Sequence, residues 1–385
     1  MIMVDPSEAA SLLQQLVRIP SVNPRAGDAP GEREVAAFVA SWLEARGIPT
    51  RLDEVLPGRP NVIATLPGRD PTRSLLLESH MDTVEVDGME VEPFGGQIDG
   101  GRLYGRGACD AKGPLAAFML AVGYLAKTGV RPPVSVTLAA VVDEEYKYRG
   151  ISSLLEKHDR FAGAIVGEPT ELDLVVAHKG CVRFQIVTIG TSTVSSMPWK
   201  GDNAIYRMVE VIDHIRRDLA SEIEAKHHPL VGPGTFCVTL IKGGVGVNII
   251  PEECTIDVDC RTLPGESPME VWRELKGRFE NLMPGHVQVR EPYIVDYALE
   301  SNPNSPIVEA LRAELRRLGR NPQEVGAPYG TDASKIALRG IPAVVFGPGF
   351  IGHAHTTREF IDLAELQTAA QAVTNLLERF GSSTL

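Results

Sequence analysis

Several features that mark secreted or membrane proteins are missing from this sequence. Cysteine is scarce, with five residues and no CxxC spacing, so neither a disulfide framework nor a cysteine-based zinc site is expected. The longest apolar stretch, Val134–Val142, is too short to cross a bilayer. The start, MIMVDPSEAASLLQQL, lacks the basic region and apolar core of a signal peptide. We therefore expect a cytoplasmic protein with reduced thiols.

Basic charge is also in deficit. Lys and Arg number 38 against 50 Asp and Glu, and the resulting net charge of −12 argues against nucleic acid or an anionic membrane as a partner. A GxSxG nucleophile elbow is absent, and Cys109 has no base partner recognisable in the sequence, so serine or cysteine catalysis is not expected. The 385 residues exceed what one hydrophobic core usually holds, which predicts two domains.

Alternating helix-like and strand-like segments dominate the first part of the chain. Helices are expected over 6–18, 31–47 and 111–129, and strands over 61–68, 74–82 and 134–146. This alternation indicates an α/β sheet covered on both faces.

The pattern changes near Lys179. From there the order is strand, helix, strand, strand, helix, strand, which is the βαββαβ order of a ferredoxin-like fold. The α/β pattern resumes with a helix over 306–318 and a last helix after Glu359. We therefore predict one larger domain over residues 1–178 and 294–385, interrupted by an inserted domain over 179–293.

Metal-ligand residue types occur where five strand-like runs end. They are His80 in SHMD, Asp110 in GACDAKG, Glu145 in DEEY, Glu168 in VGEP and His355 in GHAHTT. Imidazole and carboxylate are ligands of zinc and similar ions, and open α/β sheets build their sites at strand ends. For any one residue a structural role is the better interpretation. Together the five predict a two-metal site.

Two of these positions allow a second interpretation. His80 and Asp82 stand two apart at a strand end, and a carboxylate behind a ligating histidine fixes its tautomer, although the pair alone fits a surface turn better. Asp110 precedes a helix in a glycine-rich turn, where one carboxylate can bridge two metals or act as an N-cap.

Glu144 and Glu145 follow the most apolar strand of the chain. Adjacent residues of an extended segment face opposite ways, so we expect one to bind metal and the other to act as a general base. An exposed turn pair is the alternative.

In combination, these motifs resemble the dinuclear zinc amidohydrolase family of acetylornithine deacetylase, succinyl-diaminopimelate desuccinylase, aminoacylase and carboxypeptidase G over nearly the full length. The resemblance implies an α/β/α zinc-peptidase-like catalytic domain with an inserted ferredoxin-like lid and dimerisation domain, hence a homodimer. It implies one metal held by His80, Asp110 and Glu168, another held by Asp110, Glu145 and His355, Glu144 as the base, and Asp82 as the group that orients His80. Two divalent ions are the expected cofactors, zinc first, with cobalt or manganese as alternatives.

One position of the inserted domain departs from the resemblance. The segment GTSTVSSMPWKGDNA, from Gly190 to Ala204, resembles a family signature in which Val194 replaces a histidine that reaches the partner's site and stabilises the oxyanion. Losing one such donor costs about a hundred- to thousandfold in rate. A weakened or inactive metal- and ligand-binding homologue is therefore the alternative function.

Other polar residues resemble the family's substrate-binding groups. They are Asn248 in GGVGVNIIPEE and Arg261 in DVDCRTLPGE. Arg261 can hold a carboxylate through a bidentate pair, and a surface role is an equal alternative. Thr331 and Asp332 in GTDASK also match a motif near the cleft, which an N-cap pair explains almost as well. The predicted function is hydrolysis of an N-acyl amino acid or small peptide by metal-activated water.

Overall fold

The computed structural model describes residues 4–25, 27, 29–158 and 160–381. The chain divides into two compact units, which are described separately below. Unit 1 comprises the described residues within 1–176, 301–325 and 331–385, and unit 2 comprises 177–300 and 326–330.

Unit 1 is built on a mixed sheet with the strand order β1-β2-β6-β3-β7-β20-β8, and β18 and β19 both pair with β8. The boundary between the units falls within β8 and β19, and the two residues of β18 count with unit 2. Strands β6, β3, β7 and β20 run parallel to one another, whereas β1, β2 and β8 pair antiparallel with their neighbours. The strands are β1 Thr50–Leu56, β2 Arg59–Leu66, β3 Asp70–His80, β6 Val134–Val141, β7 Gly163–Val166, β8 Leu174–His178, β18 Leu299–Glu300, β19 Glu324–Ala327 and β20 Ala343–Val345.

Helices cover both faces of this sheet. The helices are α1 Pro6–Val17, α2 Arg33–Glu44, α3 Lys112–Thr128, α4 Arg149–Lys157, α8 Pro306–Arg317, α9 Ala333–Ala337 and α10 Leu363–Arg379. One large apolar core joins α1, α2, α3, α8 and α10 to alternate residues of the central strands. Helices α4 and α9 also contact the sheet, but their buried side chains stand outside that core, which places them on the other face. The α/β class predicted from the sequence is confirmed.

A short three-stranded sheet lies beside this arrangement, with the order β21-β5-β4. Its strands are β4 Gln97–Asp99, β5 Arg102–Tyr104 and β21 Phe360–Asp362. It joins the chain before Asp110 to the chain after His355, and the sequence analysis did not predict it.

The predicted strand over 134–146 was too long. Strand β6 ends at Val141, and Glu144 and Glu145 lie in a turn. The reason is Asp143, whose φ of 68° is left-handed and ends the extended backbone. The two glutamates are therefore not separated by strand alternation, and the turn sets their directions.

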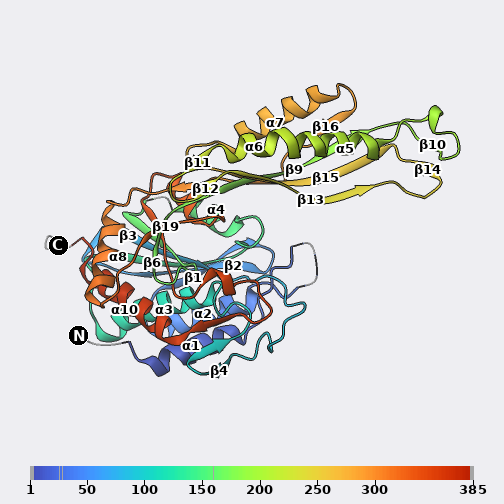
Figure 1. Ribbon diagram of the computed structural model, residues 1–385. Coiled ribbons are helices and arrows are strands. Elements are labelled where there is room, and N and C mark those ends of the chain that lie inside the picture. Colours follow the sequence, from blue (N-terminus) through green and yellow to red (C-terminus); the bar gives the residue numbers. More distant parts are fainter. Residues whose placement is uncertain (1–3, 26, 28, 159, 382–385) are drawn as a thin grey trace. The chain divides into compact units, whose positions relative to one another are not determined.

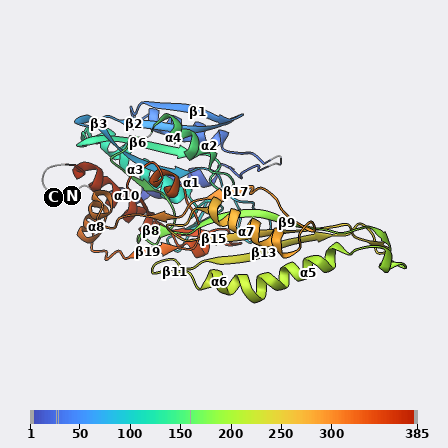
Figure 2. The same ribbon diagram turned by 90° about the horizontal axis from the view of Figure 1, so that it is seen from above.

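Unit 2 contains an antiparallel sheet with the order β13-β15-β9-β16, in which β17 also pairs with β9. Its elements follow the βαββαβ order, and Figures 1 and 2 show the helices on one face of the sheet. The elements are β9 Gly180–Ile189, α5 Ala204–His214, α6 Ala220–Glu224, β13 Thr235–Gly243, β15 Glu253–Thr262, α7 Pro268–Leu282, β16 Val287–Val289 and β17 Ile294–Asp296. The helix expected after β9 is present, with a π-helical segment, Ile215–Leu219, between α5 and α6.

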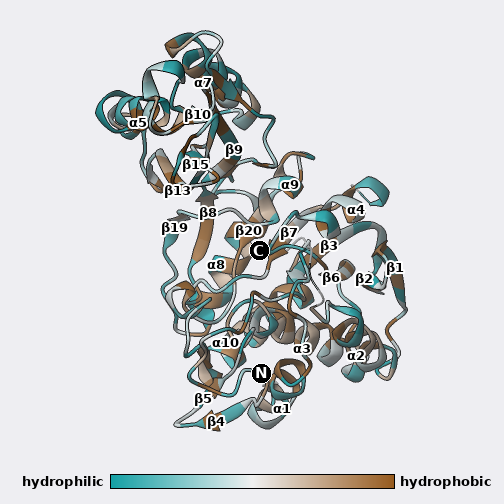
Figure 3. Ribbon diagram, turned by 90° about the vertical axis from the view of Figure 1, so that its right-hand side faces the viewer, coloured by the Kyte–Doolittle hydropathy of each residue, from teal (hydrophilic) through white to brown (hydrophobic). Residues whose placement is uncertain are grey.

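Two-residue strands complete unit 2: β10 Thr193–Val194 pairs with β14 Ile249–Ile250, and β11 His227–His228 pairs with β12 Gly232–Pro233. Figure 3 shows β8 as mainly apolar, in keeping with its burial, whereas α5 carries both apolar and polar residues. None of the helices in the described part of the chain combines the length and the apolar character that crossing a bilayer requires.

Candidate dinuclear metal site

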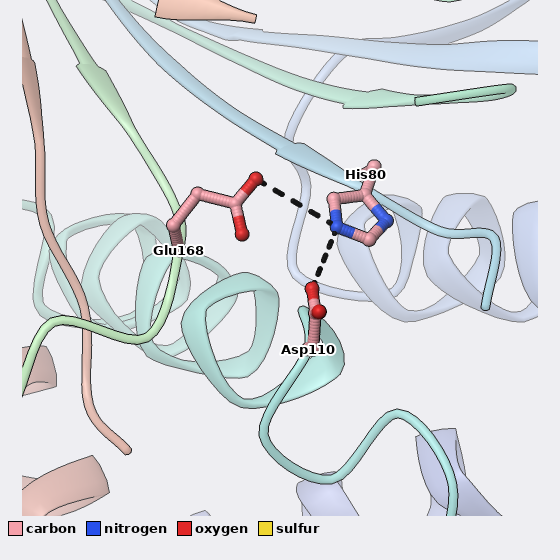
Figure 4. A group of neighbouring side chains, drawn as sticks. All are labelled: His80, Asp110 and Glu168. Atoms are coloured by element: carbon pink, nitrogen blue, oxygen red, sulfur yellow. Dashed lines mark hydrogen bonds and ion pairs between the residues drawn. The ribbon is translucent and has the colours of Figure 1, made fainter. Parts of the chain in front are cut away.

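The first ligand triad consists of His80, Asp110 and Glu168 (Figure 4). His80 ends β3, and Glu168 follows β7, the parallel neighbour of β3, so the two side chains reach the same edge of the sheet. The Nε2 atom of His80 lies 3.1 Å from Oδ1 of Asp110 and 3.8 Å from Oε1 of Glu168. All three residues are buried.

The orientation of His80 is set by its own strand end. Its Nδ1–H donates to the backbone carbonyl of Asp82 at 2.9 Å, which leaves Nε2 directed at the two acids. The Asp82 carboxylate, to which the sequence assigned this orienting role, lies 3.7 Å from Nδ1. The carbonyl is therefore the nearer partner, and an orienting role for the carboxylate stays a prediction.

The Asp82 carboxylate has other partners. It accepts hydrogen bonds from the backbone N–H groups of Glu144 and Glu145, each at 3.1 Å, and from Nδ2 of Asn23 at 2.7 Å. Asp82 thus links the end of β3 to the turn that carries both glutamates.

The second triad consists of Asp110, Glu145 and His355. The Nε2 atom of His355 lies 3.1 Å from Oε1 of Glu145 and 3.2 Å from Oδ2 of Asp110. Asp110 therefore offers one oxygen to each histidine. His355 lies in the loop after β20 with a left-handed φ of 59°, and 52% of its side chain is exposed, against 2% for His80.

The donor atoms suit two divalent cations. Within each triad, one ligand atom from every residue lies within 4.8 Å of the others. Each triad supplies one imidazole and two carboxylates, which is a common zinc donor set. Burial raises the pKa of Glu168 well above its usual range, and hydrogen bonds to Asp110 and Glu145 raise the pKa of His355 to about 10. The two triads, sharing Asp110, thus form a candidate dinuclear metal site.

The structure does not support the N-cap interpretation of Asp110. The N-cap position of α3 belongs to Ala111, and it has no side-chain cap. The peptide bond between Asp110 and Ala111 is cis.

Glu144, the predicted base, lies beside this centre. Its side chain is half-buried, and burial raises its pKa well above the usual range. Glu78, on β3, and Asp332, at the start of α9, are both buried, and burial followed by the charge of Asp332 raises the pKa of Glu78 well above its usual range. Asp332 occupies the N-cap position of α9 without capping it, whereas Thr331 Oγ1 accepts from the N–H of Ala333 at 3.2 Å.

The remaining predicted residues belong to unit 2. Arg261, on β15, donates to Asp259 at 2.7 Å, and Asn248 is exposed in the loop before β14. Val194, on β10, is 46% exposed and pairs with Ile249. The two triads are formed by residues of unit 1 alone.

Residues that the sequence did not single out support the centre. Asn23 contacts Asp82, and Glu359 contacts the backbone at Asp110. The only sequence signal for Glu359 is its place four residues after His355.

Comparison with known proteins agrees with this fold and site. The profile of peptidase family M20/M25/M40 matches residues 76–379. Acetylornithine deacetylase from Myxococcus xanthus is 31% identical over 345 residues, covering 86% of this chain and 87% of that protein. The chain belongs to peptidase family M20/M25/M40, and it is therefore a hydrolase that acts on amide bonds.

Solved structures share the fold. A tripeptidase from Staphylococcus aureus superposes with a TM-score of 0.80 at 22% identity, covering 98% of this chain and 99% of that one. A dinuclear metal-binding peptidase of the M20 family from Bacillus subtilis superposes with a TM-score of 0.71 at 18% identity, covering 97% of each chain.

Proposed function

We propose that this chain is a metal-dependent amidohydrolase that cleaves the amide bond of an N-acyl amino acid or a small peptide. The observation that carries the proposal is the pair of ligand triads that share Asp110. Its relatives include a deacetylase and peptidases, which act on these two kinds of substrate. Zinc suits the imidazole and carboxylate ligands, and cobalt and manganese accept the same set.

The residues divide the chemistry among them. His80, Asp110 and Glu168 would hold one cation, and Asp110, Glu145 and His355 the other. When bound, such a pair of ions polarises the scissile carbonyl and lowers the pKa of water. Glu144 takes the proton of the attacking water and returns it to the leaving amine. The Asp82 carboxylate accepts from the backbone N–H groups of Glu144 and Glu145, and this holds the Glu144 side chain beside the centre.

Unit 2 is proposed to act as a lid and as the contact surface of a homodimer. Strand β13 ends the sheet, and its Leu240 and Ile241 are 66% and 59% exposed. An unpaired apolar edge strand is suited to antiparallel pairing with its own copy about a two-fold axis. Arg261 and Asn248 are proposed to contact the substrate. The cytoplasmic location predicted from the free thiols stays part of this proposal.

The proposal is tested by turnover of a defined substrate panel. The zinc- or cobalt-loaded protein is assayed with N-acetyl amino acids and dipeptides, and Glu144→Gln is expected to lower kcat by about a hundred- to ten-thousandfold. Glu156→Gln, at an exposed position of α4, is the matched control and should leave kcat unchanged. Turnover that survives Glu144→Gln would exclude Glu144 as the base.

A second candidate function rests on Val194. A valine side chain has no hydrogen-bond donor, so a chain with complete triads can still be a weak enzyme or a metal- and ligand-binding homologue. The variant Val194→His tests whether the missing donor at this position limits the rate. A rise in kcat of about a hundredfold or more indicates a weakened enzyme. No rise, in a protein that already turns over rapidly, indicates that another group donates to the oxyanion.

A further inference from the structure

Glu359 is a fully buried glutamate beside the candidate metal site that belongs to neither triad. Its Oε1 accepts hydrogen bonds from the backbone N–H of Cys109 at 2.9 Å and from that of Asp110 at 3.1 Å. Its Oε2 accepts from Nη1 of Arg106 at 2.7 Å, and Arg106 is itself buried. Both oxygens are thus directed at the loop that carries Asp110.

The backbone of Glu359 also links the loop that carries Asp110 to the loop that carries His355. Its carbonyl accepts from the N–H of Gly105 at 3.1 Å, and from the next residue onward β21 pairs antiparallel with β5. Cys109 adds a further link, because its Sγ donates to the carbonyl of Phe350 at 3.3 Å. The loop that carries His355 is therefore fastened to the loop that carries Asp110 at several points.

The geometry points to Glu359 as a positioning residue for the bridging carboxylate. By fixing the backbone N–H of Asp110, it holds the Asp110 side chain so that one oxygen faces His80 and the other faces His355. This inference rests on the proposed metal site and adds to it a residue that acts through Asp110.

The physical reason lies in the shared role of Asp110. A carboxylate that serves two cations must keep both oxygens in place, and a small rotation of its backbone moves both at once. Glu359 is the acceptor that opposes this rotation, since a buried backbone N–H without a partner costs free energy. Its ion pair with Arg106, at 2.7 Å, in turn holds the buried carboxylate in place.

The test measures cobalt binding by the full chain, with calorimetry for affinity and the visible absorption of bound Co²⁺ for ligand geometry. The wild type is expected to bind two Co²⁺ per chain. Glu359→Ala is expected to weaken Co²⁺ binding by about 10- to 100-fold and to change the absorption spectrum. Glu359→Gln keeps an oxygen acceptor for the two N–H groups and loses only the ion pair, so it should give a smaller loss and a spectrum closer to the wild type.

Glu314 provides the matched control. It is also a buried glutamate in an ion pair, 2.9 Å from Arg379, but it lies on α8 and belongs to neither triad. Glu314→Ala should lower the thermal midpoint of unfolding while cobalt stoichiometry, affinity and spectrum stay those of the wild type. If Glu359 had only a structural role, both alanine variants would behave in this way.

Each outcome has one meaning. If the wild type does not bind two cobalt ions, the proposed metal site is wrong, and the positioning role that rests on it is wrong as well. If the wild type binds two and Glu359→Ala binds them with unchanged affinity and spectrum, the positioning role of Glu359 is wrong. Where the alanine variant does not fold, the same result in Glu359→Leu, which also removes the oxygen acceptor, overturns the role.

Discussion

The two triads differ in how firmly their histidines are held. His80 ends a regular central strand, its side chain is 2% exposed, and its Nδ1 is bonded to the Asp82 carbonyl. His355 lies in a loop with left-handed backbone, and 52% of its side chain is exposed. The His80 half of the site is therefore part of the folded core, whereas the His355 half is formed by a surface loop fastened to it.

This difference indicates separate roles for the two histidines. A buried histidine with a fixed tautomer gives a preorganised ligand, so binding a cation there needs little reordering. An exposed loop histidine leaves its side of the site open to substrate and solvent. Asp110 joins the two halves, since it contributes to each.

The largest loss of metal binding and turnover is expected for Asp110, the residue that serves both halves of the site. Asp110→Ala removes a ligand from both triads, so the protein should no longer bind two Co²⁺ per chain and should lose turnover by more than about a thousandfold. Asp87→Ala, at an exposed position, is the control and should bind as the wild type does. Metal analysis after gel filtration measures the stoichiometry. Two tightly bound ions in Asp110→Ala would show that the halves do not share this carboxylate.

The two histidines should separate in a stability measurement. His80→Ala and His355→Ala should each lower cobalt stoichiometry from two to one. In the metal-free protein, His80→Ala is expected to cost about 1–3 kcal/mol of unfolding free energy, because it removes a buried, hydrogen-bonded side chain. His355→Ala is expected to cost less, because 52% of its side chain is exposed and solvent screens its ion pairs with Asp110 and Glu145. Denaturant titration of the two variants measures this difference, and equal losses would contradict the comparison.

The candidate ligands can be selected from the sequence because the ends of buried strands can be recognised in it. Apolar runs before His80 and Glu168 predict buried parallel strands, and such strands end at one edge. The turn at Glu144 could not be predicted, because it depends on the left-handed backbone conformation of Asp143, which no local sequence pattern requires. Of the two antiparallel strands β1 and β2, only β2 was predicted, since β1 is largely exposed and its apolar residues do not alternate with polar ones.

Supporting residues were harder to find for a different reason. Glu359 contacts Cys109 across 250 positions of sequence, and Asn23 contacts Asp82 across 59. Contacts of this kind exist only after the strands have paired, so a single sequence gives no signal for them. The carbonyl partner of His80 cannot be predicted from the sequence, because any residue at position 82 supplies a carbonyl.

The smallest expected effect tests whether the halves are also linked through Asp82. The Asp82 carbonyl holds His80, and its carboxylate holds the N–H of Glu145, while Asn23 donates to that carboxylate at 2.7 Å. Asn23→Ala leaves both triads complete but removes this support, so kcat should fall by no more than about tenfold, with cobalt stoichiometry unchanged. Asn304→Ala, at an exposed position, is the control. Loss of one ion in Asn23→Ala would mean that Asp82, rather than Asp110 alone, couples the buried half of the site to the exposed half.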